Sequence, residues 1–497
     1  MSGRPAPGLA RRFAGVSRTR LLLVSAATVA AMPGPTHART PTPGTDPRIS
    51  AAHRTVSRTH VEIPAFARKY RTTCSTCHTA APKLNVLGEA FRLNGYRFPE
   101  NDELLRRDRP VPLGAEPWKD LWPRSIWPGE LPGSIPLALR IVNDLQVTND
   151  PDSEAPWNFG FPDEIYILAG ATLGETIGAF MSTEWSREEG LEAVQAKVQF
   201  QDPIAALPDR ALNLWIGLQN LYLFTLADRQ IDRATRVNYR WQTFRPSDID
   251  LENPDTGETL ASENGFRLRD TQPAIELNGI GGGRFYYGVG VSQGAGSLTE
   301  DNNGRKDLFY KVRYKLGGLR LDGTYSDGEG PVLGGRGQLM DRSVIFEHFG
   351  YFGEEPVAGD TGDSHRSFGV DARLLYGPLD LAVGYVWGRN RNPWGDLAEG
   401  ELPHRSFFGR AEYLFYPWLI GSLKFDLFKA DVPAPVRDAG FTLGAFDQTR
   451  ILPGAIILIR HNVRTVLEAE LFTKHAANDG RGRKRPHTLW VRLDVAF

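Results

Sequence analysis

The chain has 497 residues, of which 41% are hydrophobic, and its 58 basic and 59 acidic residues give a formal net charge of −1. This balance gives no sign of the basic patch or domain typical of nucleic-acid-binding proteins, so no nucleic-acid partner is expected. With only two cysteines, the chain excludes both a disulfide framework and a four-cysteine zinc site.

Residues 1–38 have the pattern of a secretory signal peptide. Five arginines precede residues 21–32, an apolar stretch that is short for a bilayer crossing but suits the core of a signal. Thr36-His37-Ala38 provides a small-residue cleavage site, which places the mature start near Arg39. The alternative is an N-terminal membrane anchor. Either interpretation predicts that the chain leaves the cytoplasm.

The segment Cys74-Ser75-Thr76-Cys77-His78 has the spacing of covalent c-type haem attachment. Two thiols on one helical turn reach the two vinyl groups of a porphyrin, and the next residue offers an imidazole to the iron. A redox-active cysteine pair or half of a zinc site is the alternative, which the lack of any other cysteine disfavours. The sequence therefore predicts one covalent haem c, with His78 as an iron ligand.

Residues 39–110 are predicted to form a small helical haem domain. Pro64 and Pro82 each suit the first turn of a helix. The second of these helices is expected to end at Gly95. Its apolar face would carry three residues, Leu84, Leu87 and Phe91.

The sixth iron ligand stays open. None of the four methionines lies between residues 38 and 110, so a methionine ligand from the haem domain is excluded. His60 and His53 lie just upstream of the motif, and His60 is the preferred candidate. A water molecule or an open position is the alternative.

Residues 111–134 form a linker rich in proline and tryptophan, which disfavours both helix and central strand. From residue 135 to the end, apolar and charged residues alternate with a period of two, as in half-buried strands. One expected strand carries Leu308, Tyr310, Val312, Tyr314 and Leu316 on one face and Lys311, Arg313 and Lys315 on the other. Residues 319–325 continue the alternation and predict a further strand.

Two architectures suit such strands: a soluble sandwich and a transmembrane β-barrel with an aqueous lumen. The strand lengths of about ten residues favour the barrel. So do aromatic residues near the expected strand ends, as at Tyr385, Trp387, Tyr413, Phe415, Tyr416 and Trp418. The alternating terminal stretch ends on Phe497 and resembles the sorting signal of bacterial outer-membrane barrels.

The predicted fold is therefore mainly β: an antiparallel barrel of about 16 strands over residues 135–497 in a bacterial outer membrane, with outer-membrane lipid around it. The small α-helical cytochrome c domain precedes it. Residues 221–250 have helix-like charge spacing and suit either a long extracellular loop or a segment inserted into the lumen.

The haem region resembles the fused monohaem cytochrome–porins, the family of outer-membrane iron oxidases in iron-oxidising bacteria. The residues that carry the resemblance are Ile63-Pro64-Ala65-Phe66-Ala67-Arg68-Lys69-Tyr70, Cys74-Ser75-Thr76-Cys77-His78, Pro82-Lys83-Leu84-Asn85, Gly88, Phe91 and Gly95-Tyr96. Arg71 departs from the glycine expected there. The resemblance implies a haem domain in or under the barrel, held through Cys74, Cys77 and His78, that takes electrons at the cell surface and passes them to periplasmic carriers.

Three functions are compatible with the sequence. The first is an electron conduit of oxidoreductase type that carries electrons from extracellular Fe(II), or a similar small reductant, to a periplasmic cytochrome or copper protein. The second is a diffusion porin whose haem domain serves as a sensor or a plug. The third is a conduit that reduces an extracellular acceptor. The direction depends on the haem potential, which axial ligation, hydrogen bonding and burial determine.

Overall fold

The computed structural model describes residues 65–99 and most of 102–497. Several stretches lie outside the described residues, the longest being 1–64, 122–129, 224–236, 295–303, 326–340, 439–445 and 476–486. The expected signal peptide, His53 and His60 therefore fall outside them, as does part of the expected linker. Among the described residues, no helix combines the length and the apolar character that a membrane crossing requires.

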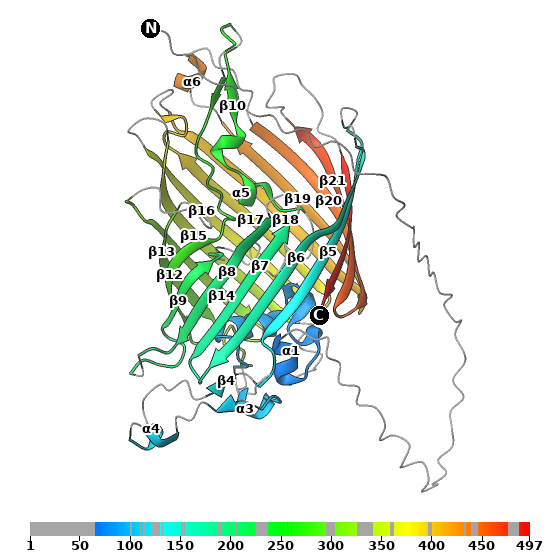
Figure 1. The fold of residues 1–497 in the computed structure, drawn as a ribbon. Helices are drawn as coiled ribbons and strands as arrows, with labels where there is room; N and C mark the ends of the chain where they lie inside the picture. The colour runs from blue at the N-terminus through cyan, green and yellow to red at the C-terminus, as the bar shows by residue number, and fades with distance from the viewer. Residues whose placement is uncertain are drawn as a thin grey trace, which may run out of the picture. The chain divides into compact units, whose positions relative to one another are not determined.

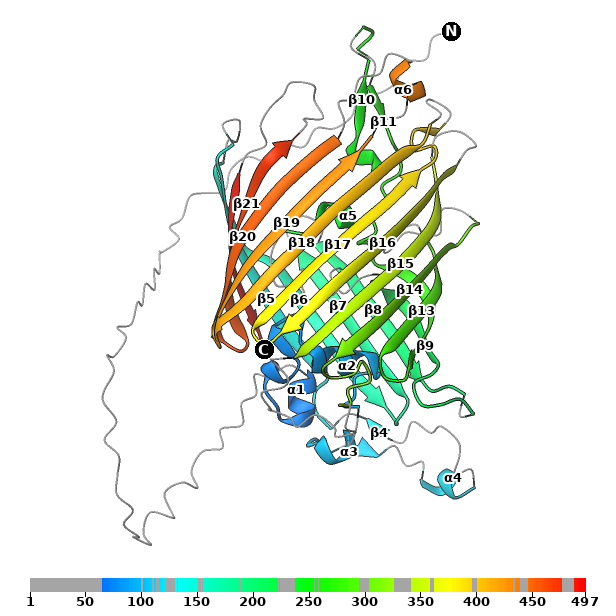
Figure 2. The ribbon, with the colours of Figure 1, turned by 180° about the vertical axis from the view of Figure 1, so that it is seen from behind.

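Sixteen strands close into one antiparallel barrel, in which each strand pairs with its sequence neighbours and the last pairs with the first (Figures 1 and 2). The strands are β5 (Leu137–Thr148), β6 (Trp157–Leu173), β7 (Ile177–Ser186), β8 (Gly190–Gln201), β9 (Asn213–Gln219), β12 (Gln272–Gly281), β13 (Phe285–Ser292), β14 (Asp307–Gly317), β15 (Arg342–Pro356), β16 (Gly362–Tyr376), β17 (Leu379–Asn390), β18 (Leu402–Tyr416), β19 (Leu419–Ala430), β20 (Phe446–Arg460), β21 (Val463–His475) and β22 (Thr488–Ala496). The predicted barrel of about 16 strands is confirmed.

The strands are two-faced, as the alternation predicted. On β14, Lys311, Arg313 and Lys315 are buried inside the barrel, whereas Leu308 is 54% exposed on the outer face. The outer face elsewhere carries the same kind of side chain, as at Val370, Val383, Phe407 and Leu423. A barrel with charges inside and an apolar outer wall is the arrangement that a lipid bilayer requires.

The ends of the barrel differ. At one end, five connections have only two or three residues, as at 174–176, 377–378 and 461–462, and two are longer, at 202–212 and 318–341. Most of the loops at the other end are longer than three residues. The predicted girdle residues Tyr413, Phe415, Tyr416 and Trp418 are all exposed near the short turns. Bacterial outer-membrane barrels have short periplasmic turns and longer extracellular loops. The chain is thus an outer-membrane barrel with its short turns on the periplasmic side.

The strand predicted over residues 319–325 is wrong. Strand β14 ends at Gly317, because Gly317 and Gly318 both adopt positive φ angles, of 75° and 54°. The alternation of apolar and polar residues here has another cause. Leu319 is buried against the N-terminal segment, and Leu321 is buried among residues of the barrel wall and Leu93.

The N-terminal segment, residues 65–109, lies at the short-turn end of the barrel, next to the C-terminus (Figures 1 and 2). We call it the haem segment, after the expected cofactor. Its elements are α1 (Ala65–Tyr70), the 3₁₀ turn η2 (Cys74–Thr76), β1 (His78–Ala80), β2 (Lys83–Leu84), α2 (Val86–Leu93) and α3 (Asp102–Leu105). The short elements β3 (Val111–Pro112), α4 (Glu116–Leu121) and β4 (Glu130–Leu131) follow it.

Helix α2 begins later than predicted. Asn85, and not Pro82, starts it: the Asn85 side chain accepts a hydrogen bond of 2.9 Å from the backbone N–H of Gly88. The end is close to the prediction, because the helix stops at Leu93 and Gly95 follows with a φ of 65°.

The haem segment packs directly against the barrel wall. Ala80 joins Ile420, Ile456 and Val466 in one buried cluster. The backbones approach so closely that a β-carbon on Gly178 of β7 would collide with the carbonyl oxygen of Gly95. Glycine at this strand position therefore allows the segment to lie against the wall.

Buried ion pairs add to this contact. The Lys83 ammonium contacts Asp380 at 2.7 Å and also contacts Glu412, and the Lys83 side chain is 2% exposed. Glu89 of α2 accepts from Arg313 of β14 at 2.7 Å. Charges on the lumen wall thus pair with the buried charges of Lys83 and Glu89 on the haem segment.

A second insertion enters the lumen from the loop end. The described residues of 220–271, which we call the plug, contain α5 (Arg240–Thr243), η4 (Pro246–Asp248), β10 (Asp250–Glu252) and β11 (Thr259–Ala261). The short helix α6 (Ala434–Asp438) lies in a later loop. Of the two alternatives for residues 221–250, the described part, chiefly 237–250, is inserted into the lumen.

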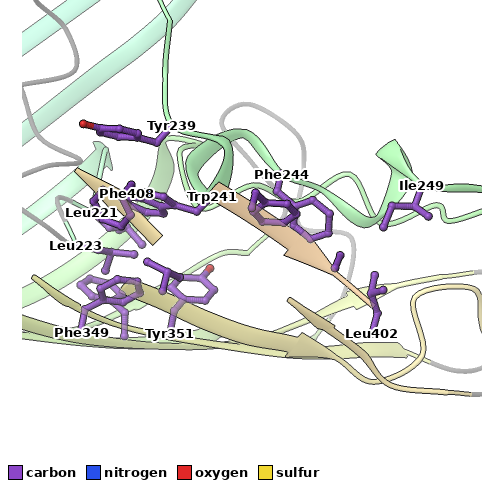
Figure 3. Packing of buried hydrophobic residues seen from close by; sticks show 14 of the residues in the cluster. Leu221, Leu223, Tyr239, Trp241, Phe244, Ile249, Phe349, Tyr351, Leu402 and Phe408 are labelled. Atoms are coloured by element: carbon purple, nitrogen blue, oxygen red, sulfur yellow. The ribbon is translucent and has the colours of Figure 1, made fainter. Parts of the chain in front are cut away.

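The plug is held by apolar packing on one side and by hydrogen bonds on the other. Trp241 and Phe244 are almost fully buried among aromatic residues of the wall, as Figure 3 shows for Phe349, Tyr351 and Phe408. On the other side, two wall carboxylates accept from plug backbone N–H groups: Asp426 from Arg240 at 2.7 Å and Glu468 from Val237 at 2.9 Å.

Replacing Lys83 by alanine is expected to loosen the haem segment. Removal of one partner from a buried ion pair costs about 3–5 kcal/mol, and we expect about 3 kcal/mol because Arg373 and Arg410 stay near the two carboxylates. In limited proteolysis of the purified protein, the segment of the variant should then be cleaved about a hundredfold faster than that of the wild type.

The matched control is Arg389→Ala, which removes an exposed ion pair with Glu401 and should cost no more than about 1 kcal/mol. Equal cleavage rates in the two variants would contradict the role assigned to Lys83.

Candidate haem site

The predicted attachment residues lie on one tight turn. The N–H groups of Thr76 and Cys77 donate to the carbonyls of Thr73 and Cys74 at 3.1 and 3.2 Å, which forms the 3₁₀ turn η2. His78 follows directly as the first residue of β1. This is the single turn that the motif predicted.

Asn85 holds that turn in place from the next element. Its backbone N–H donates to the Cys77 carbonyl at 2.9 Å, and its side-chain amide donates to the carbonyls of Ser75 and Thr76 at 3.1 Å each. The same residue caps α2, so the turn and the helix form one unit. The attachment residues are thereby fixed relative to the apolar face of α2.

Cys74, Cys77 and His78 all line one cavity. Its volume, counted as the space open to the centre of a water molecule, is about 210 Å³. We call it the haem cavity. Its wall on the haem segment is apolar and largely aromatic, with Phe66, Tyr70, Leu84, Phe91 and Phe98. The barrel supplies the rest of the wall, including Ala138, Leu168, Ala169, Gly170 and Phe180.

These residues fit a haem c. A porphyrin is flat and mostly apolar, and the cavity presents it with apolar side chains beside two thiols and an imidazole. Gly170 on β6 is part of this fit, because a β-carbon there would collide with the ring of Phe66. The aromatic rings are ordered against one another: Phe66 stacks on Tyr96 with the ring centroids 5.3 Å apart, and it meets Phe91 edge to face at 5.2 Å.

The cavity also has a charged side. Arg140 and Arg464 both line it, and both donate to Asp494 of β22 at 2.7 Å. Two guanidinium groups share one carboxylate, so this side of the cavity keeps a positive charge. Such a side suits the two propionate groups of a haem, because guanidinium groups bind carboxylates through charge-assisted hydrogen bonds.

The alternatives for the cysteine pair fit less well. Burial within the apolar cluster of the segment, with a smaller effect of Cys74, raises the pKa of the Cys77 thiol to about 12. A reactive or metal-binding cysteine needs a thiolate, which a raised pKa disfavours. A thioether needs no charge. Among the described residues, no group of three or more histidine, cysteine, aspartate or glutamate side chains is arranged to hold a metal ion.

The barrel side of the cavity was not predicted from the sequence. Arg140, Tyr166, His461, Arg464 and Asp494 all line it, yet they lie on strands or turns far from the motif in the chain. The only sequence signal was the strand alternation, which marks a lumen-facing position without saying what faces it. The predicted candidate His60 lies outside the described residues, so its position stays untested.

Neither protein-family models nor curated proteins give a match to the chain. Among solved structures, it is similar to OmpF of Salmonella typhi in complex with daunomycin, with 10% identity, 74% of this chain and 98% of that chain covered, and a TM-score of 0.47. It is also similar to an anion-selective porin from Comamonas acidovorans, with 12% identity, 73% and 99% coverage, and a TM-score of 0.46. Similarity at this level does not bear on what this chain binds or carries.

Proposed function

We propose that this chain is an outer-membrane cytochrome that carries electrons across the membrane, from extracellular Fe(II) to a periplasmic cytochrome or copper protein. One observation carries the proposal: Cys74, Cys77 and His78 line a cavity that the haem segment shares with residues of membrane-spanning strands, such as Ala138, Leu168 and Phe180. A haem c bound there would supply reversible one-electron chemistry. The choice of Fe(II) as donor rests on the resemblance of the haem region to outer-membrane iron oxidases.

Each part of the cavity has a role in this proposal. Cys74 and Cys77 would hold the cofactor through thioether bonds, and His78 would provide an iron ligand. Phe66, Phe91 and the barrel wall would exclude water, which contributes to the potential of a buried haem. Arg140 and Arg464 would bind the propionates and orient the ring.

Strand residues of the barrel line this cavity at its short-turn end, so the wall would separate a bound haem from the lipid. An apolar band roughly 25 Å tall separates the cell surface from the periplasm, and tunnelling weakens steeply with distance. A haem at the short-turn end of the barrel would cover part of that distance and shorten the remaining step. Only electrons cross, so iron and its poorly soluble ferric product stay outside the cell.

The plug favours this proposal over a diffusion porin. It places buried side chains such as Trp241 and Phe244 inside the lumen, and the haem segment packs on the wall at the opposite end. Packed protein leaves little path for hydrated solutes but supports electron tunnelling. The reverse electron flow, to an extracellular acceptor, uses the same parts, and the potential of the site decides between the two directions.

The plug should keep the channel closed to ions. In planar bilayers we expect wild-type protein to show little conductance, because both ends of the lumen are occupied. When residues 224–266 are replaced by a short Gly/Ser linker, we expect stepwise increases in conductance as open channels insert into the bilayer. Faster migration of the unheated variant on gels serves as the control for barrel folding. Porin-like conductance of the wild type would favour the diffusion porin instead.

Cofactor attachment should depend on both cysteines. Cys74→Ala and Cys77→Ala are each expected to abolish or strongly reduce the haem stain of the denatured protein, because each removes one thioether. Ser75→Ala, between them, should leave the stain intact. Covalent haem in both cysteine variants would refute the attachment site.

Electron delivery is tested by mixing anaerobic Fe(II) with proteoliposomes that carry the oxidised protein. We expect the haem absorption to change to the reduced form, with no change in protein that has lost Cys74 and Cys77. Dithionite serves as the positive control. Haem that stays oxidised with Fe(II) at several pH values, yet is reduced by dithionite, would exclude Fe(II) as donor and leave a general conduit.

A further inference from the structure

The barrel contributes a histidine to the haem cavity. His461 lies in the two-residue turn between β20 and β21, and it lines the same cavity as Cys74, Cys77 and His78. Its side chain is exposed and makes no hydrogen bond with the described residues. It is the only histidine other than His78 among the described residues that line the cavity.

The other lining residues are poorer iron ligands. Haem iron takes axial ligands from histidine, methionine, cysteine or tyrosine. No methionine is among the described lining residues. The hydroxyl of Tyr70 donates to Asp102 at 2.6 Å, and that of Tyr166 donates to Glu164 at 2.9 Å. Both of these phenols are thus engaged in hydrogen bonds. The ring of the third lining tyrosine, Tyr96, stacks on Phe66 and on Phe180. The imidazole of His461, by contrast, is available.

The turn that carries His461 is well anchored. Asn462 exchanges two hydrogen bonds with Ala496 of the last strand: its carbonyl accepts from the Ala496 N–H at 2.9 Å, and its side-chain amide donates to the Ala496 carbonyl at 2.9 Å. On the other side, the N–H of Leu458 donates to the Trp418 carbonyl at 2.8 Å. Ligands carried by rigid elements hold their position more accurately than those on free loops.

We infer that His461 is the sixth ligand of the haem, supplied by the barrel and not by the haem segment. This inference rests on the proposed haem attachment at Cys74 and Cys77. The bond uses the lone pair of a neutral imidazole nitrogen and displaces a water molecule, so no electron is gained or lost. His78 and His461 then join the two parts of the chain through one iron atom.

Ligation by two histidines has spectroscopic consequences. It makes a six-coordinate, low-spin haem whose iron binds external ligands slowly, because a protein ligand has to leave first. It also makes the spin state depend on the docking of the haem segment, because one ligand belongs to each part. A haem ligated by His60 would be independent of the barrel.

The test compares full-length His461→Ala, His60→Ala and His348→Ala in detergent, by electron paramagnetic resonance and by carbon monoxide binding. His348 is the matched control, because it lies on β15 away from the cavity and bonds to Tyr310 and Gly369. Only His461→Ala should become high-spin when oxidised. Its ferrous form should bind carbon monoxide on the order of tenfold faster or more, since no protein ligand has to leave.

Rescue and staining separate the possible failures. Added imidazole should restore the low-spin signal in His461→Ala, and the haem stain of the denatured protein should stay at the wild-type level. Low-spin His461→Ala, or a high-spin signal in His60→Ala alone, would overturn the ligand assignment and leave the attachment site standing. If Cys74→Ala loses the haem stain while His461→Ala keeps it, covalent attachment and iron ligation are shown to depend on different residues. If His461→Ala fails to fold, His461→Met replaces it and should shift the potential and the spectrum.

Discussion

Closure of the barrel is the constraint on which the rest of the structure depends. In a membrane each backbone N–H and carbonyl has to find its partner within the protein, and a sheet meets this demand only when its last strand pairs with its first. Here β22 pairs with β5 over nine residues, and even the backbone of Phe497 exchanges hydrogen bonds with Leu139. The closed wall then has an apolar outside and a charged inside. Those inner charges bind the haem segment through Asp380 and the plug through Asp426.

The fold was largely predictable because membrane strands alternate strictly between lipid and lumen. The pattern from Leu308 to Leu316 identified β14 with the correct faces. The same pattern failed at residues 319–325, where burial against the haem segment produces alternation without a strand. The position of residues 221–250 stayed open, because a plug buries apolar side chains inside the barrel, where strand alternation predicts polar ones.

The site was predictable only where it is local. Cys74, Cys77 and His78 share one turn, and covalent chemistry fixes their spacing. Arg140, His461 and Asp494 reach the same cavity from strands or turns at both ends of the barrel sequence. The alternation of apolar and polar residues along their strands marks Arg140 and Asp494 as lumen-facing. Their contact with the cavity depends on how the haem segment packs against the barrel, and no short sequence pattern encodes that packing.

The place of Asp494 in the chain has a consequence for biogenesis. Asp494 lies on the last strand and holds the two arginines of the haem cavity, so this side of the cavity exists only after the final strand has been added. The cysteines precede this strand by more than 400 residues. Enzymes that attach haem need access to both thiols in an open peptide, whereas both thiols are partly buried in the folded chain. Under the proposed function, haem attachment would therefore precede closure of the barrel in the membrane, and the closing strand would complete the cavity around a cofactor already in place.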